Sequence, residues 1–384
     1  MNAVLQYSLL SPFSVKARQL CAAFGVQLRL TPQDGGLRSA AQIQARMGLA
    51  ARGLGRSLHR SPSALEELPL VPWLFPDSGG YLCDSTEIGL YLESQHPGRR
   101  LTPRDGACGF AARLIEEAVD EVGLYALHHM RWVASGRSTT AMAVLEDEVA
   151  GSLGRRMARR FVTHFGPRQV RRLPYLFSVA PDAASFPDLP EAMRPPSRSG
   201  FPPTHDLLEQ IWEGLVDATE AALSDGRAYL FGDGFTLADA ALIGNLGSTL
   251  RVDPEAARRL EARAPHTTQW LRRHLDGAPV LAGDHTLDAA LEPLLSWAMS
   301  SFLPLMEWNE AAHAGGPAGG LRNERAFDRG VNLYDGALLG HPYRTVVKDF
   351  QVKTYRELGR LFLALSPDDM RRLDGHGVVL APWG

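Results

Sequence analysis

Cysteine is scarce in this chain, and its few thiols are not paired by spacing. Three cysteines occur among 384 residues, at Cys21, Cys83 and Cys108, and no two stand in a Cys-x-x-Cys arrangement. The sequence therefore gives no indication of a disulfide framework or a dithiol redox centre, and it fits reduced thiols in a cytoplasmic protein. His128 and His129 are adjacent rather than one helical turn apart, so no metal site is expected.

The chain also lacks long apolar runs and a strong excess of charge. No apolar stretch is long enough to cross a bilayer, and no basic region precedes an apolar one at the N-terminus. Neither a membrane helix nor a secretory signal is therefore expected. A formal net charge of −3 argues against a nucleic-acid partner. What remains is an ordinary globular composition, 45% hydrophobic and 22% charged, in a chain long enough for two domains.

The first informative motif lies near the N-terminus. Residues 3–7 form an apolar run that predicts a strand, and the apolar spacing over 15–23 predicts a helix. Ser11 and Pro12 stand at the junction, where backbone N–H groups are unpaired and the helix dipole is positive. Such a position can bind an anion or lower the pKa of a thiol, although a serine there can also be a plain N-cap.

A second region repeats this arrangement. Residues 70–75 and 81–88 contain two short β-rich runs around an Asp-Ser-Gly-Gly turn, which predicts a hairpin. Pro72 stands at the entry of the first run, where an edge or a bend is expected and a cis peptide costs little. Asp84 and Ser85 precede an amphipathic run and are therefore expected at a second helix N-terminus.

A third motif lies far downstream. Thr236 and Asp239 follow a glycine-containing turn at the spacing typical of a capping box. Together with the Ser-Pro-Phe-x-x-Lys-x-Arg helix start at 11–18, the Val-Pro strand and the Asp-Ser-Thr-x-Ile helix start, this order of motifs resembles the glutathione S-transferases, the serine-type zeta and tau classes in particular. The resemblance implies a thioredoxin-like N-terminal domain, with a mixed four-stranded sheet and helices, followed by an all-α C-terminal domain.

The resemblance and the helical spacing together divide the chain into three parts. We expect a thioredoxin-like domain over 1–101, an all-helical domain over 105–285, and a helical extension packed on it over 286–384. The extension resembles that of unusually large bacterial members of the family. The expected helices beyond the first domain cover residues 107–135, 204–224, 236–249, 267–275, 286–312 and 343–365, with a Pro-rich loop over 181–203. An arginine-rich insertion at 38–60 is either a solvated loop or a contact for the glycine carboxylate of glutathione.

The resemblance also implies which residues bind glutathione. Ser11 matches the serine that activates the thiol, and Tyr7 is its rival because other classes use a tyrosine at the end of this strand. The glutathione contacts carried over from the family are Ser11, Phe13, Lys16, Val71, Pro72, Asp84 and Ser85. Asp84 departs from the Glu that is more usual in the family, which keeps the charge but shortens its reach.

The long helix over 107–135 corresponds to the helix that lines the second-substrate pocket in this family. Its candidate lining residues are Tyr125, His128, Arg131 and Trp132, each of which packing against neighbouring helices would also explain. These features predict an enzyme that activates glutathione as a co-substrate for attack on a small hydrophobic electrophile, by conjugation, ether cleavage, dehalogenation or isomerisation. The other function left open is a non-catalytic ligand- or partner-binding protein. A cytoplasmic homodimer without a membrane or nucleic-acid partner is expected.

Overall fold

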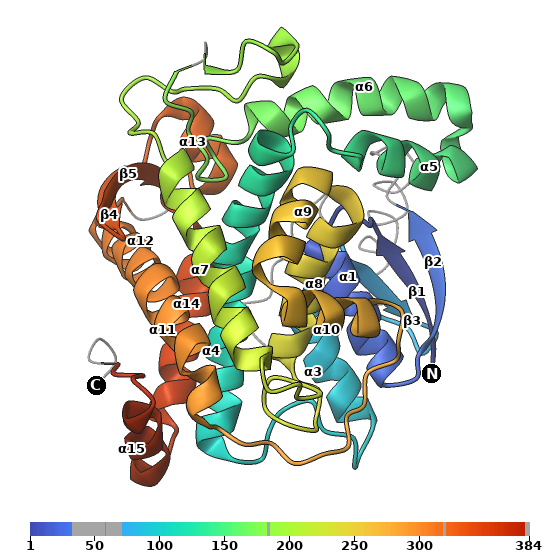
Figure 1. The fold of residues 1–384 in the computed structure, drawn as a ribbon, viewed down its shortest axis with the longest axis vertical. Coiled ribbons are helices and arrows are strands. Elements are labelled where there is room, and N and C mark those ends of the chain that lie inside the picture. The colour runs from blue at the N-terminus through green and yellow to red at the C-terminus, as the bar shows by residue number, and fades with distance from the viewer. Residues whose placement is uncertain (33–57, 59–70, 183–184, 318–319, 381–384) are drawn as a thin grey trace.

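The structure is a computed structural model that describes residues 1–32, 58, 71–182, 185–317 and 320–380. The N-terminal residues form a small domain with a sheet, and the rest of the described chain forms a larger, mainly helical body beside it (Figure 1). No helix in the described part of the chain is long and apolar enough to cross a lipid bilayer.

The N-terminal domain is built on a mixed sheet that has three strands among the described residues. β1 (Asn2–Tyr7) lies in the centre, parallel to β2 (Gln27–Pro32) and antiparallel to β3 (Trp73–Pro76). Helix α1 (Pro12–Ala23) connects β1 to β2, and helix α3 (Ser85–Gln95) follows the sheet. This β-α-β unit with an antiparallel third strand has the thioredoxin-like arrangement that was predicted.

The fourth strand of the predicted sheet is reduced to a single bridge in the described part of the chain. After β3 the chain turns through Gly79 and Gly80, whose φ angles are 94° and 84°, and it pairs again only between Leu74 and Leu82. Asp84 already caps helix α3, so too few residues remain between the turn and the helix for a regular strand. The peptide before Pro72 is cis, as expected.

The helical domain is arranged around one long helix, α4. Its elements are α4 (Gly106–His129), the π-helix η1 (Met130–Ala134), α5 (Ala141–Leu153), α6 (Arg155–Arg171), the short η3 (Glu191–Met193), α7 (His205–Leu223), α8 (Leu237–Val252), α9 (Pro254–Arg263) and α10 (Pro265–Leu275). α4 packs against α7 and α8, and the predicted capping box of Thr236 and Asp239 begins α8. Helix α9 was not predicted from the sequence.

The two domains meet where α1 packs on α8. A Cβ atom at Gly244 of α8 would lie 2.6 Å from the Pro12 carbonyl oxygen, so only glycine allows the two helices to approach this closely. The contact holds the first turn of α1, and with it Ser11, against the helical domain.

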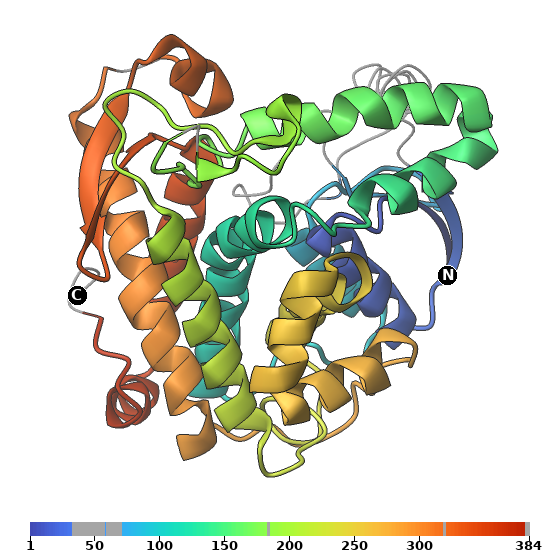
Figure 2. The same ribbon diagram turned by 45° about the horizontal axis from the view of Figure 1, so that its top comes forward.

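The C-terminal extension covers the side of the helical domain away from the sheet (Figures 1 and 2). Its elements are η4 (Ala289–Leu291), α11 (Glu292–Trp297), the π-helix η5 (Ala298–Phe302), α12 (Leu303–Gly315), α13 (Asn323–Arg329), β4 (Leu333–Leu338), β5 (His341–Val346), α14 (Asp349–Leu363) and α15 (Pro367–Gly375). Both α14 and α15 contact α4, and the ring of Phe362 lies 5.4 Å from that of Phe110.

The helix predicted over 343–365 is wrong in its first part, because residues 341–346 form a hairpin strand. β4 and β5 pair in antiparallel register around Leu339 and Gly340, whose φ angles are 48° and 81°. Tyr343 lies opposite Gly336, where a Cβ atom would fall 2.4 Å from the tyrosine ring. The glycine therefore makes room for the ring, and the helix begins only at Asp349. The extension thus contains one β-hairpin besides its helices, whereas the elements over 106–275 are all helical, as predicted.

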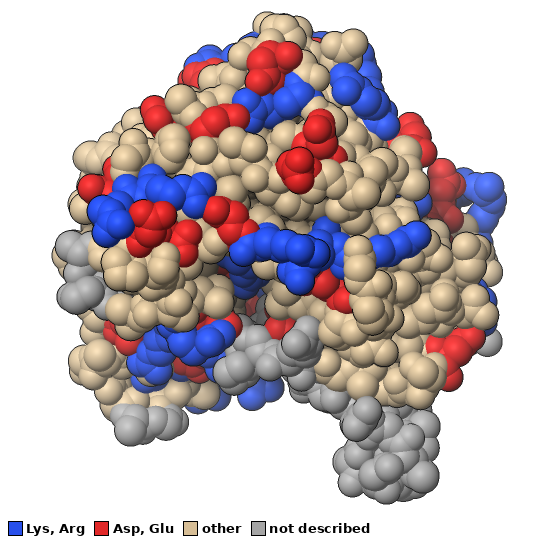
Figure 3. Space-filling view, turned by 90° about the horizontal axis from the view of Figure 1, so that it is seen from below, with Lys and Arg blue, Asp and Glu red and all other residues tan. Residues whose placement is uncertain are grey.

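The surface carries mixed charge. On the face drawn in Figure 3, basic and acidic side chains are interspersed over the same elements. Surface ion pairs of the described chain include Arg263–Asp217 and Arg356–Glu310. The pattern agrees with the small net charge of the chain.

Candidate functional site

The predicted thiol site lies where the start of α1 meets the strand entry at Pro72. Ser11 is the N-cap of α1: its backbone is extended, and its Oγ accepts a hydrogen bond from the Ser14 amide at 3.3 Å. The same hydroxyl lies 3.4 Å from the carbonyl oxygen of Val71, to which it donates. Ser11, Phe13 and Val71 are half-exposed, so these groups can be reached by a ligand.

Two residues of the helical domain hold the loop that carries Ser11. The Glu148 carboxylate on α5 accepts hydrogen bonds from the Ser8 hydroxyl, at 2.8 Å, and from the Leu9 amide. Arg131, in the π-helix, donates to the Leu10 carbonyl at 2.6 Å. Sequence reasoning did not identify Glu148, since a single acid in a helical run carries no signal of a contact 140 residues away.

Tyr7, the rival of Ser11, is at the end of β1 and half-exposed. Burial and the neighbouring Glu148 carboxylate raise the pKa of its phenol, although the Arg18 guanidinium, 5.7 Å from the ring centre, acts in the opposite direction. The phenol is therefore held in its neutral form, which can still donate a hydrogen bond.

Asp84 and Ser85 begin α3, as predicted, but the aspartate already uses part of the helix start. Its Oδ1 accepts from the amides of Thr86 at 2.9 Å and Glu87 at 3.1 Å. The amide and hydroxyl of Ser85 have no hydrogen-bond partner among the described residues. Ser85 is thus the donor left for an incoming carboxylate at this helix end.

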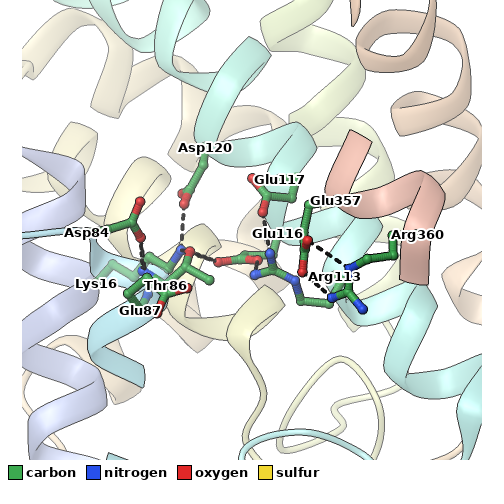
Figure 4. Close-up of polar contacts among 10 residues, drawn as sticks. All are labelled: Lys16, Asp84, Thr86, Glu87, Arg113, Glu116, Glu117, Asp120, Glu357 and Arg360. Carbon is green, nitrogen blue, oxygen red and sulfur yellow. Dashed lines mark hydrogen bonds and ion pairs between the residues drawn. The ribbon is translucent and has the colours of Figure 1, made fainter. Parts of the chain in front are cut away.

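Lys16 does not lie at the glutathione end of α1. It is 1% exposed and points into the interface with α4, where its Nζ donates to Glu116, to Asp120 at 2.5 Å and to Thr86 at 2.9 Å (Figure 4). All three of its N–H donors are used in this way. The predicted contact between Lys16 and glutathione does not fit this position, and the residue connects the two domains instead.

The cluster around Lys16 contains more acids than bases. Arg113 pairs with Glu116 and with Glu117 at 2.5 Å, beside the Lys16 contacts (Figure 4). Burial opposes the charge of Lys16, but Asp120 and Glu116 hold its pKa above the usual value. Burial raises the pKa of Asp120 to about 7, since Glu116 adds to it and Lys16 offsets only part.

Of the four predicted pocket residues, the two that lie in η1 are placed in the core. Arg131 is buried, and its Nε donates to both oxygens of Asp253, at 3.0 and 3.1 Å. Trp132 is buried in an apolar cluster with Leu145 and Val170. The prediction that these two side chains line an open pocket does not fit these positions, because Arg131 braces the Ser11 loop and Trp132 packs between helices.

The other two predicted pocket residues, Tyr125 and His128, lie on α4 itself. Tyr125 is buried, and its hydroxyl accepts from Gln351 at 2.8 Å and from Lys348. His128 is half-exposed, and burial of its ring with the nearby Arg131 charge lowers its pKa to about 3. The imidazole of His128 is therefore neutral near pH 7. The arginine-rich insertion at 38–60 falls, except for Leu58, outside the described residues.

Part of the helical domain is similar to a known protein family. Residues 202–273, which span α7 to α10, match the family model of the glutathione S-transferase C-terminal domain. No curated protein matches the chain. The match thus identifies residues 202–273 as a glutathione S-transferase C-terminal-type segment, which in this chain follows a thioredoxin-like N-terminal domain.

The solved structures that the comparison found are distant from this chain in sequence. A glutathione S-transferase of Methylobacterium radiotolerans JCM 2831 in complex with glutathione sulfonate is 20% identical, over 75% of this chain and 99% of its own, with a TM-score of 0.38. The beta-etherase LigF of Sphingobium sp. strain SYK-6 is 17% identical, over 77% and 99%, with a TM-score of 0.43. A glutathione S-transferase of Methylobacillus flagellatus KT with GSH bound is 17% identical, over 73% and 100%, with a TM-score of 0.36.

Proposed function

We propose that this protein is a glutathione transferase-like enzyme, in which Ser11 activates the thiol of bound glutathione. The observation that supports this most directly is the position of the Ser11 hydroxyl, at the positive end of α1 and 3.4 Å from the Val71 carbonyl. A thiolate placed between them would accept a hydrogen bond from the hydroxyl and lie on the helix axis. Both effects favour the charged form of the sulfur over the thiol.

The rest of glutathione would contact the groups on either side of this position. The backbone of Val71 would pair with the cysteinyl part, and the Ser85 amide and hydroxyl would bind the γ-glutamyl carboxylate. Asp84 would then lie near the γ-glutamyl ammonium, although its carboxylate also caps α3. The sulfur would attack a small hydrophobic electrophile, with conjugation, ether cleavage, dehalogenation and isomerisation as the reactions open to it. We expect the enzyme to act as a cytoplasmic homodimer.

The test compares Ser11→Ala with Tyr7→Phe in the full chain. We expect the thiol pKa of glutathione to be lowered by about one to three units when it is bound to the wild-type protein. The ultraviolet absorbance of the thiolate, recorded during a pH titration of the complex, measures this pKa. Ser11→Ala should raise that pKa and slow conjugation about a hundredfold or more, as for the loss of one oriented donor. If Tyr7→Phe abolishes activity and Ser11→Ala does not, the phenol activates the thiol.

The competing function is a binding protein with no catalysis. Retention of the wild-type chain on immobilised glutathione, followed by a screen of aromatic and aliphatic electrophiles, separates the two. Retention without turnover of any electrophile, and with an unshifted thiol pKa, would contradict the enzymatic proposal.

A further inference from the structure

The loop over residues 8–10 leads from β1 to Ser11, and the helical hairpin made of α5 and α6 holds it. This hairpin extends from the helical domain over the N-terminal domain (Figures 1 and 2), where α5 contacts β2. The hairpin lies outside the segment over 202–273 that matches the family model. Its contacts with the loop are therefore a property of this chain that the matched segment does not imply.

The side chain of Leu10 anchors the loop in the apolar core of the hairpin. Leu10 is 8% exposed and packs in one cluster with Leu145 and Val149 of α5, Val162 of α6 and Trp132 of η1. Because the hydrophobic effect favours this burial, the middle of the loop is fixed to the hairpin rather than to the sheet from which it leads.

The polar groups of the loop converge on Glu148 of α5. Its carboxylate accepts hydrogen bonds from the Ser8 hydroxyl at 2.8 Å and from the Leu9 amide, and the Ser8 hydroxyl in turn accepts from the Leu10 amide at 3.2 Å. On the other side, Arg131 donates to the Leu10 carbonyl at 2.6 Å. One carboxylate thus orients donors from three consecutive residues, directly or through one hydroxyl.

Glu148 differs from the two acids that precede it on α5. Glu146 and Asp147 form ion pairs with α6, to Arg159 at 3.0 Å and to Arg155 at 4.0 Å. Glu148 has no such ion pair in the part of the chain that the structure describes, and its oxygens accept from neutral donors of the loop instead. Hydrogen bonds to an ionised acceptor are about twice as strong as those between neutral groups, so this carboxylate can hold the loop firmly.

The loop passes this support on to the first turn of α1. The Ser11 amide donates to the Ser8 carbonyl at 3.0 Å, and the Ser8 amide donates to the Ser14 hydroxyl at 3.3 Å. The bond from the Ser11 hydroxyl to Val71, at 3.4 Å, is longer than the usual O–H···O distance of about 2.7–2.8 Å. The position of this hydroxyl therefore depends on the backbone that Ser8 fixes more than on its own contact.

We infer that Glu148 is a positioning residue for the proposed reaction: through Ser8 and the Leu9 amide, it holds the Ser11 hydroxyl towards the thiol of bound glutathione. Glu148 acts through the loop and does not touch the sulfur. The hairpin of α5 and α6 is thus part of the apparatus that sets the thiol site. The role of Ser11 rests on the proposed function, whereas the effect of Glu148 on the loop is a property of the free protein.

The charge of Glu148 and its hydrogen bonds have opposite effects on a nearby thiolate. Burial and the Glu148 carboxylate raise the pKa of Tyr7, while Arg18 opposes them. Burial also raises the pKa of Glu148 itself, and the bonds from Leu9 and Ser8 and the charge of Arg18 lower it. A negative charge here disfavours a second anion, so acting by charge alone it would raise the thiol pKa of bound glutathione. Positioning of Ser11 lowers that pKa, and the sign of the change on removing Glu148 separates the two effects.

The first test follows the loop in the full chain without glutathione. We expect hydrogen exchange at the Leu9 amide, measured by nuclear magnetic resonance, to become about 10- to 100-fold faster in Glu148→Met, as for the loss of one hydrogen bond to a charged group. Glu148→Gln, which keeps one acceptor oxygen, should show a smaller increase. The matched control is Glu146→Met, one of the paired acids on the same helix, which should leave this rate unchanged. Near-ultraviolet circular dichroism verifies that each variant is folded.

The second test follows the thiol. In Glu148→Met, the thiol pKa of bound glutathione should rise by about one unit and conjugation should slow about 10- to 100-fold, with little change in the KM for glutathione. Ser8→Ala removes the other partner of the same bond and should shift both quantities in the same direction, so the test does not depend on one variant being folded.

Three outcomes would overturn the inference: Leu9 exchange that is unchanged in Glu148→Met, a thiol pKa that falls in this variant, or a thiol pKa that stays at the wild-type value while the wild type lowers it. A different result would contradict the proposed function alone. In that case Glu148→Met accelerates exchange at Leu9, but the wild-type protein binds no glutathione or leaves its thiol pKa unshifted.

Discussion

Arg131 donates a hydrogen bond to the carbonyl of Leu10 at 2.6 Å, and so joins the helical domain to the loop that presents Ser11. The same guanidinium is held by Asp253 through Nε, at 3.0 and 3.1 Å. The π-helix that contains Arg131 follows directly on α4. Because such local widening of a helix often occurs at functional sites, this one is well placed to aim the side chain at the loop.

Replacing Arg131 should destabilise the protein and disturb Ser11. Arg131→Met leaves the buried Asp253 without its partner, and we expect a loss of about 3–5 kcal/mol in the free energy of unfolding. The double variant Arg131→Met/Asp253→Leu should recover much of that loss, since no buried charge remains unpaired. Urea unfolding of the single and double variants measures this.

The matched control is Arg137→Met, which breaks an exposed pair with Asp188 and should cost less than about 1 kcal/mol. Equal losses in Arg131→Met and Arg137→Met would show that the buried pair contributes no more than a surface one. In the folded double variant, conjugation should still be slower than in the wild type, because the Leu10 carbonyl has lost its donor.

Lys16 provides a second test, in which stability and binding separate. Lys16→Met removes the cation between Glu116 and Asp120, and the loss of one partner of a buried pair should cost about 3–5 kcal/mol. The affinity of the folded variant for glutathione should stay close to that of the wild type, because the Lys16 donors are all used within the interface. Calorimetry measures the affinity for glutathione, with Lys353→Met as the surface control. A large loss of glutathione affinity in Lys16→Met at unchanged stability would instead place Lys16 in the glutathione site.

The sequence predicted the local features of the site better than its long-range contacts. Ser11, Asp84 and the Thr236 capping box were found because an N-cap is defined by neighbouring residues, and Pro72 because cis peptides are confined to proline. Lys16 was misplaced because a family motif fixes its helix but not the acids that face it on α4.

In the extension, long-range contacts likewise decide which secondary structure forms, and the sequence alone did not predict it. Tyr343, Thr345 and Val346 are aromatic or β-branched and stand directly before the apolar spacing of α14, so periodicity alone did not separate strand from helix. The hairpin is decided by the turn at Gly340 and by the space that Gly336 leaves for Tyr343. Likewise, nothing local to Lys348 indicates that it reaches Tyr125, which is 223 residues away.

The acids on α4 predict a pH dependence of stability. Burial raises the pKa values of both Asp120 and Glu121 to about 7. Between the ordinary pKa of a carboxyl group and about 7, the folded protein therefore holds more protons at these sites than the unfolded chain. Their contribution to stability is complete at low pH and is lost as the pH rises through 7.

The variant Asp120→Asn/Glu121→Gln should remove this dependence. His128 and His205, whose pKa values are lowered to about 3, act in the opposite direction below about pH 6.5, so the comparison is between variant and wild type at each pH. We expect the variant to gain stability relative to the wild type, by about 1–3 kcal/mol, between pH 5 and pH 8 in urea unfolding. A constant difference over that range would contradict the shifted pKa values.

The final prediction is that the extension is part of the fold and not a detachable segment. Among the apolar side chains that truncation after residue 316 removes are five that are at most 3% exposed, those of Phe327, Val346, Val352, Leu358 and Leu373. Burial of each is worth about 1.5–3 kcal/mol, so together they contribute about 7–15 kcal/mol before ordering costs, as much as the net stability of a domain. The truncation also exposes Phe110 and the Tyr125 face of α4. We expect an insoluble or loosely packed product, without the near-ultraviolet circular dichroism and cooperative melting of the full chain. A soluble truncated protein that melts cooperatively at the temperature of the full chain would show that the extension is an independent module, and that α4 is packed well enough without it.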